Sequence, residues 1–156
     1  MPLPPRLRLA EILTDRHVAV PLGASTKDEL LHELVALAAP NVADHETLVA
    51  EVRAREAAFP TVLGDGVALP HVRTAHVDAV HVAAGVLRHP VAFGSADGLP
   101  VDLFFLVLTP AQAPSDHLSV LRGISQLLAH PETVASLRAA PSAEAFLATI
   151  RTAPLA

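Results

Sequence analysis

The run VDLFFLVL, residues 101–108, constrains the fold more than any other segment of this chain. Apolar residues occupy both alternating sets of positions in it, which is typical of a strand buried on both faces of a sheet. A helix needs roughly 20 apolar residues to cross a bilayer, so this run is too short to be a transmembrane helix. The sequence therefore predicts a globular protein whose sheet is covered on both sides, without direct membrane insertion.

Helical patterns flank the strand region. Thr26 and Glu29 have capping-box spacing, and the apolar stripe that follows them stops at Pro40. A second helix is predicted from about Asp44 to about Ala57. After the strands, three more helices are predicted: one from Ser115, one with Pro131 in its first turn, and one from Ser142 through Arg151.

Strand character fills the middle of the chain. The segment VALPH, residues 67–71, is extended because the residue before a proline is pushed out of the helical region. Residues 80–87 and 101–108 have the composition of buried strands. This order of elements predicts an α/β fold, a three-layer-like arrangement of a mixed central β-sheet with helices packed on its faces. A length of 156 residues suits a single domain over residues 1–156, with its core at about 9–151.

The composition excludes several classes of function. A net charge of −5 argues against a nucleic-acid-binding scaffold, which needs a basic face for phosphates. The chain has no cysteine, hence no disulfide, thiolate nucleophile or cysteine zinc site, and this fits a cytoplasmic protein. The opening residues contain no apolar stretch long enough for the core of a signal peptide.

The nine histidines are the remaining candidates for chemistry. The spacing of His71, His76, His81 and His89 gives no helical metal-binding pair, so no metal site is expected. The sequence also lacks the serine-hydrolase elbow, the Walker loop and the dinucleotide fingerprint. His76, His81 and His89 are therefore interpreted as structural or surface residues.

His71 differs from the others because it follows a rigid proline. Neutral imidazole is a good nucleophile near neutral pH, since the ordinary pKa of a histidine is about 6.5. Gly64 and Gly66 precede it, and glycines allow a backbone to approach a bulky group closely. The stretch is compatible with a histidine that carries a phosphoryl group beside the two glycines, although the spacing alone is not specific.

A wider stretch, RAREAAFPTVLGDGVALPHVRTAHV at residues 53–77, resembles a known phosphorylation-site region. It contains Arg55-Glu56, Pro60-Thr61, Gly64-Asp65-Gly66 and Leu69-Pro70-His71. This pattern is similar to the enzyme IIA domains of the bacterial phosphoenolpyruvate-dependent sugar phosphotransferase system, in their fructose–mannitol and nitrogen-regulatory class. FGSADGLPVDLFFLVLTP resembles that family's second strand pair, and DHLSVLRGISQLL resembles the helix with its second histidine. The resemblance extends from about Leu9 to Arg151.

The resemblance implies roles for four residues. His71 would be the phosphorylated residue, and His117 the second active-site histidine that supports the phosphate. Arg55 and Thr61 match positions beside the site, where a guanidinium and a hydroxyl bind or orient phosphate. No metal, nucleotide or other cofactor is implied. Arg73 has no firm family assignment and is interpreted as a surface arginine.

The resemblance also implies partners. The donor would be the phosphocarrier HPr or its nitrogen-branch counterpart, and the acceptor a IIB domain. Three interpretations stay open: a IIA protein for sugar uptake, a nitrogen-related regulator whose His71 phosphorylation state controls protein partners, and a degenerate member that binds without being phosphorylated. Asp65 and Pro60 depart from the commoner family residues. A shallow apolar rim is expected around His71, because two partners must dock there transiently.

Overall fold

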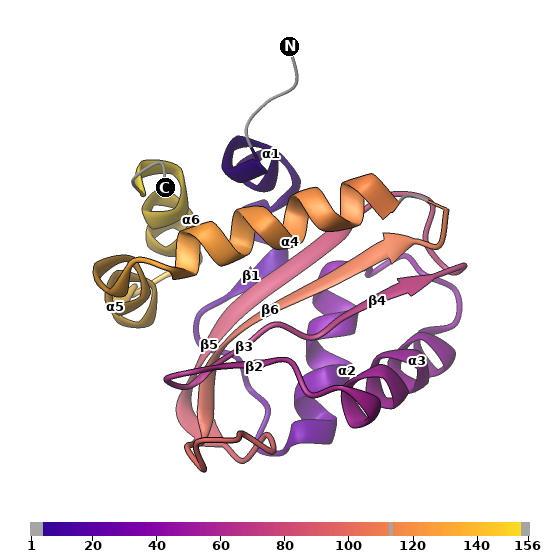
Figure 1. Cartoon of the computed structure of the whole chain (residues 1–156), viewed down its shortest axis with the longest axis horizontal. Coiled ribbons are helices and arrows are strands. Elements are labelled where there is room, and N and C mark those ends of the chain that lie inside the picture. The colour runs from indigo at the N-terminus through magenta and orange to yellow at the C-terminus, as the bar shows by residue number, and fades with distance from the viewer. Residues whose placement is uncertain (1–4, 113, 154–156) are drawn as a thin grey trace.

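A computed structural model describes residues 5–112 and 114–153. Its strands form one mixed sheet with helices on both faces (Figure 1), so the α/β fold predicted from the sequence is confirmed. The helices are α1 (Pro5–Ile12), α2 (Lys27–Ala38), α3 (His45–Ala58), α4 (Pro114–Leu128), α5 (Pro131–Ala139) and α6 (Ala143–Thr152). The strands are β1 (Val18–Ala19), β2 (Val62–Gly64), β3 (Val67–Ala68), β4 (His71–Thr74), β5 (His81–Val91) and β6 (Val101–Pro110).

Strand β6 is the centre of the sheet. The order is β1-β5-β6-β3-β2, and β4 pairs with β6 further along, beyond the short strand β3. β5 and β6 are antiparallel, whereas β3 and β4 run parallel to β6 and β1 runs parallel to β5. A 3-10 turn, Asp15–His17, leads into β1.

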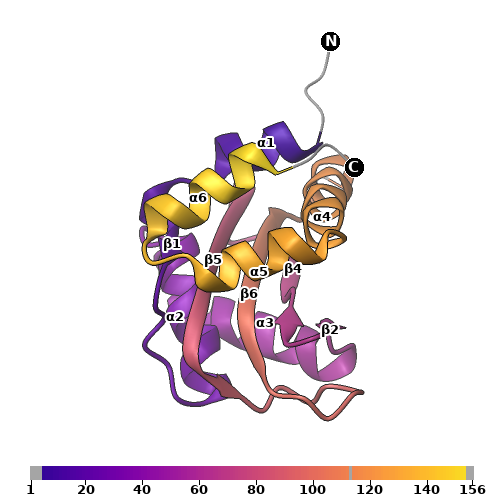
Figure 2. The same ribbon diagram turned by 90° about the vertical axis from the view of Figure 1, so that its left-hand side faces the viewer.

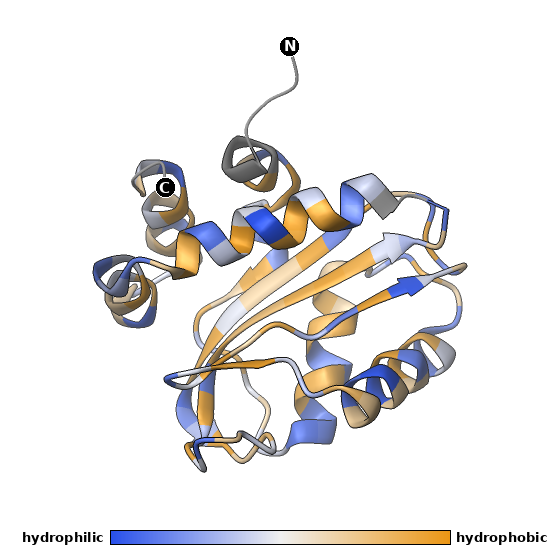
Figure 3. Ribbon diagram, viewed as in Figure 1, coloured by the Kyte–Doolittle hydropathy of each residue, from blue (hydrophilic) through white to orange (hydrophobic). Residues whose placement is uncertain are grey.

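The helices cover the sheet in two layers. Figures 1 and 2 show α2 and α3 on one face and α1, α4, α5 and α6 on the other. Alternate residues of β6 enter the two cores: Phe104, Leu106 and Leu108 pack with α2 and α3, and Leu103, Phe105 and Val107 with the other helices. Figure 3 shows the hydrophobic residues concentrated along β5 and β6. The predicted double burial of residues 101–108 is confirmed for all of them except Asp102, which is only partly buried.

Three helices start where the sequence predicts, including the two for which Thr26 and Ser142 were expected as caps. The side chains of Thr26, Asp44 and Ser142 each accept the backbone N–H of the residue three positions on, at 3.1, 3.0 and 3.1 Å. Such a cap stabilises a helix by about 1 kcal/mol, because it satisfies an N–H that has no partner within the helix. The predicted first, second and last helices correspond to α2, α3 and α6.

Two elements near the N-terminus were not predicted. Helix α1 lies in a stretch rich in proline and arginine, and its buried residue Leu9 packs into the core beneath α4 and α6. Strand β1 is two residues long and pairs through Val18 with Ala84 of β5. Both elements depend on tertiary contacts that a local pattern does not contain. In the described part of the chain, no helix has the length and apolar character needed to span a membrane.

Candidate functional site

His71 is the first residue of β4, opposite Val107 of β6, and its side chain is partly buried. Its Nδ1 lies 2.8 Å from the carbonyl oxygen of Leu69. A carbonyl oxygen can only accept a hydrogen bond, so Nδ1 carries the hydrogen and the lone pair of the neutral ring is on Nε2. Nε2 makes no hydrogen bond to residues 5–112 or 114–153, so the nucleophilic nitrogen is available to a partner.

His117 lies in the first turn of α4, next to His71. The two ring centroids are 5.4 Å apart and the rings are tilted by 50°. The Nδ1 of His117 is 2.8 Å from Oγ1 of Thr109, a fully buried residue near the end of β6. This hydrogen bond fixes the orientation of the His117 ring, while the amides of the first helical turn favour an anion nearby. The structure thus brings together the two histidines that the resemblance singled out.

The pKa of His117 is lowered from its ordinary value of 6.5. Burial of the ring is the main cause, followed by electrostatic interactions with His71, Arg73 and Arg55 that disfavour a second positive charge. His117 is therefore neutral at pH 7 and offers one N–H and one acceptor nitrogen. A neutral ring can support a phosphoryl oxygen by donating a hydrogen bond.

Arg55 occupies the last turn of α3. Its Nη1 donates to the carbonyl oxygen of Phe59 at 3.3 Å, and its guanidinium lies 5.1 Å from the centre of the Phe59 ring. The positive charge of Arg55 contributes to the lowered pKa of His117, after that of Arg73, while its guanidinium is bonded to Phe59. Two large apolar side chains are exposed: Phe59, which contacts Arg55, is 67% exposed, and Leu118, which follows His117 in α4, is 65% exposed.

Thr61 connects α3 to the segment that precedes His71. Its backbone N–H and its hydroxyl both donate to the buried carboxyl group of Glu56, at 3.0 and 2.6 Å. Its carbonyl accepts the N–H of Leu69 at 2.9 Å, and the Leu69 carbonyl holds His71. The Thr61 hydroxyl hydrogen is given to Glu56, so the contact between Thr61 and His71 runs through the backbone of Leu69.

The two glycines do not lie beside His71. Gly66 precedes β3, where Val67 is opposite Leu103, whereas His71 is opposite Val107. Four residues of strand separate these positions, about 13 Å. A Cβ on Gly66 would lie 2.7 Å from the guanidinium of Arg138, which is paired with Asp102. The expectation that these glycines approach the phosphate is therefore wrong; both have the positive φ of a tight turn, and Gly66 packs against Arg138.

Arg73 was interpreted as a surface arginine, and it is exposed. It is nevertheless on the same face of β4 as His71, because side chains two residues apart on a strand point the same way. This alternation was visible in the sequence and was missed. The hydrogen bond from Thr109 to His117 was missed too, because it joins two elements whose distance apart no local pattern provides.

The remaining histidines fit the structural and surface interpretation. His76 is exposed and its Nε2 lies 3.4 Å from the carboxyl group of Glu51, which also accepts the hydroxyl of Thr74 at 2.8 Å. His89 is exposed and His81 partly buried. Within residues 5–112 and 114–153, no three His, Cys, Asp or Glu residues are grouped as a metal site.

The chain thus combines a mixed α/β sheet with two neighbouring imidazoles at one end of it. This is the arrangement implied by the resemblance to the enzyme IIA domains. This chain belongs to the family described as "Phosphoenolpyruvate-dependent sugar phosphotransferase system, EIIA 2", whose model matches residues 11–153.

The chain is similar along most of its length to nitrogen regulatory proteins. It is 36% identical to one from Pseudomonas aeruginosa over 90% of this chain and 92% of that protein, and 33% identical to one from Bradyrhizobium diazoefficiens over 94% and 96%. The crystal structure of the nitrogen regulatory protein IIA-Ntr from Neisseria meningitidis has a TM-score of 0.85 at 33% identity, over 92% of this chain and 99% of that one. The fructose-specific EIIABC component of Bacillus subtilis is 28% identical over 90% of this chain, which is 22% of that longer protein.

Proposed function

We propose that this protein carries a phosphoryl group on Nε2 of His71, accepting it from a phosphocarrier protein and passing it to a second protein. The observation that supports this most directly is the hydrogen bond from Nδ1 of His71 to the Leu69 carbonyl, which leaves Nε2 as the nucleophile. The neighbouring ring of His117, 5.4 Å away, provides a neutral group for the phosphoryl oxygens.

The transfer step follows from this tautomer. The Nε2 lone pair of His71 attacks phosphorus, a new P–N bond forms, and the P–N bond to the donor histidine breaks. The donor imidazole leaves neutral when its other nitrogen carries a hydrogen. His71 then holds the phosphoryl group on Nε2 and a hydrogen on Nδ1, so no proton has to move. The Leu69 carbonyl stabilises the resulting positive ring, and catalysis consists of positioning and charge stabilisation.

The donor in this proposal is HPr or its nitrogen-branch counterpart, and the location is the cytoplasm. For the acceptor there are two candidates. A regulatory target is favoured by the relatives matched over nearly their whole length, which are named nitrogen regulatory proteins. A IIB domain for sugar uptake is favoured by the match to fructose-specific EIIABC and EIIA components.

The test is labelling with phosphoenolpyruvate, enzyme I and each of the two phosphocarriers in turn, followed by intact mass measurement. We expect one phosphoryl group on the wild type, labile in acid and stable in base, and none on His71→Ala. His89→Ala, which removes an exposed histidine of β5, is the matched control and should label normally. A wild type that stays unlabelled with both active donor chains would overturn the proposal.

The second histidine has a separate outcome. His117→Ala should still be labelled on His71 but more slowly, because the neighbouring neutral ring no longer supports the phosphoryl oxygens. Stopped reactions sampled over time measure this rate. A rate equal to that of the wild type would remove His117 from the proposed site.

A further inference from the structure

Strand β4 carries two basic side chains, His71 and Arg73, on the same face. Val72 faces the core formed with α2 and α3, and the hydroxyl of Thr74 donates to Glu51 of α3. The alternation of a strand therefore directs His71 and Arg73 to the opposite face, where α4 lies. Two residues along a strand are about 6.6 Å apart. The long side chain of Arg73 can therefore reach a group that is held on the His71 ring.

The register of the sheet places Arg73 beside the second histidine as well. Arg73 is opposite Thr109 of β6. Thr109 is the residue whose hydroxyl is bonded to Nδ1 of His117. The register of the sheet therefore brings Arg73 to the same end of the sheet as His71 and His117.

The guanidinium of Arg73 is free to bind a ligand. In the described part of the chain it has no hydrogen bond and no ion pair, and it is exposed. The guanidinium of Arg55, in contrast, donates to the Phe59 carbonyl and stacks on the Phe59 ring. Of the two arginines, Arg73 also has the larger effect on the pKa of His117, which it lowers together with burial and His71.

We propose that Arg73 is the principal cation that binds the phosphoryl oxygens on His71, ahead of Arg55. This rests on the proposed phosphorylation of His71. A phosphoryl group presents several anionic oxygens, and the planar fork of an arginine can bind two of them at once. Arg73 forms and breaks no covalent bond and transfers no proton. Its positive charge offsets the negative charge of the phosphoryl oxygens, which would otherwise repel a second anionic group.

The first measurement is the rate of phosphoryl transfer to Arg73→Gln, with Arg88→Gln as the matched control. Arg88 is an exposed arginine of β5 at the other end of the sheet, so this variant has the same change of charge. We expect Arg73→Gln to be slower by roughly tenfold to a hundredfold, Arg55→Gln to lose less, and Arg88→Gln to match the wild type. Arg73→Lys should recover part of the rate, because it restores charge without the fork.

The second measurement needs no donor protein. Inorganic phosphate is titrated into the wild type and Arg73→Gln while the ring resonances of His71 and His117 are followed by NMR. We expect weaker phosphate binding in Arg73→Gln and a higher pKa of His117, because a repelling positive charge has been removed. Exposure of the His117 ring by unfolding would also raise its pKa, so an unchanged thermal stability of Arg73→Gln is the control that excludes this cause.

The outcomes separate this inference from the proposed function. An unlabelled wild type whose phosphate binding depends on Arg73 overturns the phosphoryl-transfer proposal and supports the anion site. Equal phosphate binding by wild type and Arg73→Gln overturns the anion site, whatever the labelling shows. Slower transfer with unchanged phosphate binding would assign Arg73 to the docking of a partner protein. That outcome also overturns the proposal that Arg73 binds the phosphoryl oxygens.

Discussion

Thr109 and His117 are joined by a 2.8 Å hydrogen bond between Oγ1 and Nδ1, which connects the end of β6 to the first turn of α4. Thr109 is fully buried, so the hydroxyl cannot turn to water and the bond is retained. The nitrogen that His117 directs to the neighbouring site is consequently Nε2.

Thr109→Val should keep the shape of the threonine and remove this hydrogen bond. We expect His117 to lose its fixed tautomer and phosphoryl transfer to slow several-fold, with labelling still on His71. The ¹⁵N shifts of the His117 ring report the tautomer directly. Thr109→Ser keeps the hydroxyl and should behave like the wild type; a Thr109→Val protein with unchanged shifts and rate would contradict the assignment.

Glu56→Gln should loosen the segment before His71. The Glu56 carboxyl group accepts two hydrogen bonds from Thr61, and a glutamine amide has only one acceptor oxygen for them. We expect a loss of about 1–3 kcal/mol in the free energy of unfolding, measured in urea, together with slower labelling of His71. Glu144→Gln, an exposed change in α6, should alter stability by less than about 0.5 kcal/mol and leave labelling unchanged.

Gly66→Ala should destabilise the fold without abolishing the phosphorylation of His71. Gly66 has φ +78°, and a Cβ there would lie 2.7 Å from Arg138 Nη2 and 3.3 Å from the Pro100 carbonyl. Gly98→Ala separates the two costs, because Gly98 has a similar φ of +73° with no atom within 4 Å of a Cβ. We expect roughly 1 kcal/mol for Gly98→Ala and more for Gly66→Ala, by urea unfolding. Loss of labelling in folded Gly66→Ala would restore the glycines to the phosphate site.

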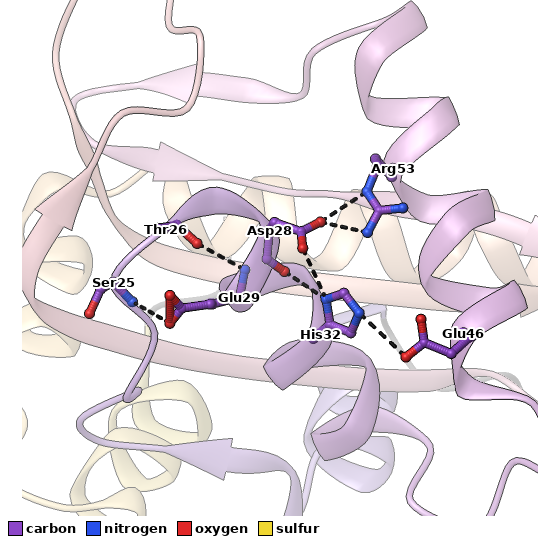
Figure 4. A network of polar contacts seen from close by, with 7 residues as sticks. All are labelled: Ser25, Thr26, Asp28, Glu29, His32, Glu46 and Arg53. Carbon is purple, nitrogen blue, oxygen red and sulfur yellow. Dashed lines mark hydrogen bonds and ion pairs between the residues drawn. The ribbon is translucent and has the colours of Figure 1, made fainter.

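His32 predicts a small pH dependence of stability. His32 is a residue of α2 whose ring lies beside Asp28 of α2 and Glu46 of α3, and Arg53 of α3 is paired with Asp28 at 2.5 Å (Figure 4). Its pKa is raised, first by its hydrogen bond to the Asp28 carbonyl and then by the nearby acidic charges. The stability it contributes is fully present below the unfolded pKa of about 6.5 and is lost as the pH rises through the higher folded pKa.

The measurement compares the wild type with His32→Gln in urea at about pH 5.5 and about pH 8.5. The ring is partly exposed to solvent, which screens its interactions, so the difference between the two proteins should be below about 1 kcal/mol and larger at the acid pH. The opposite sign would mean that burial outweighs the carboxylates at this position.

The fold was largely predictable because its elements carry strong local signals. The apolar run of β6 specifies double burial, and Thr26, Asp44 and Ser142 mark helix starts through hydrogen bonds three residues away. Helix α1 and strand β1 were not predictable in this way, since one is stabilised by the core beneath it and the other by pairing with β5.

The site was predicted in part. The resemblance singled out His71 and His117, and the fold brings their ring centroids to 5.4 Å from each other. Strand alternation could also have placed Arg73 on the His71 face. The mistaken position of Gly66 arose because five residues of sequence in extended conformation span a large distance, so glycines near His71 in sequence are remote from it in space.

The segment that carries His71 is held at both ends by one helix. Glu56 and Glu51, both on α3, bind Thr61 before the segment and Thr74 after the histidine. Helix α3 packs on the face of the sheet opposite α4, so the position of the reactive imidazole depends on a core that it does not touch. A mutational screen for loss of transfer should therefore recover buried positions of α2 and α3 as well as the residues around the two imidazoles.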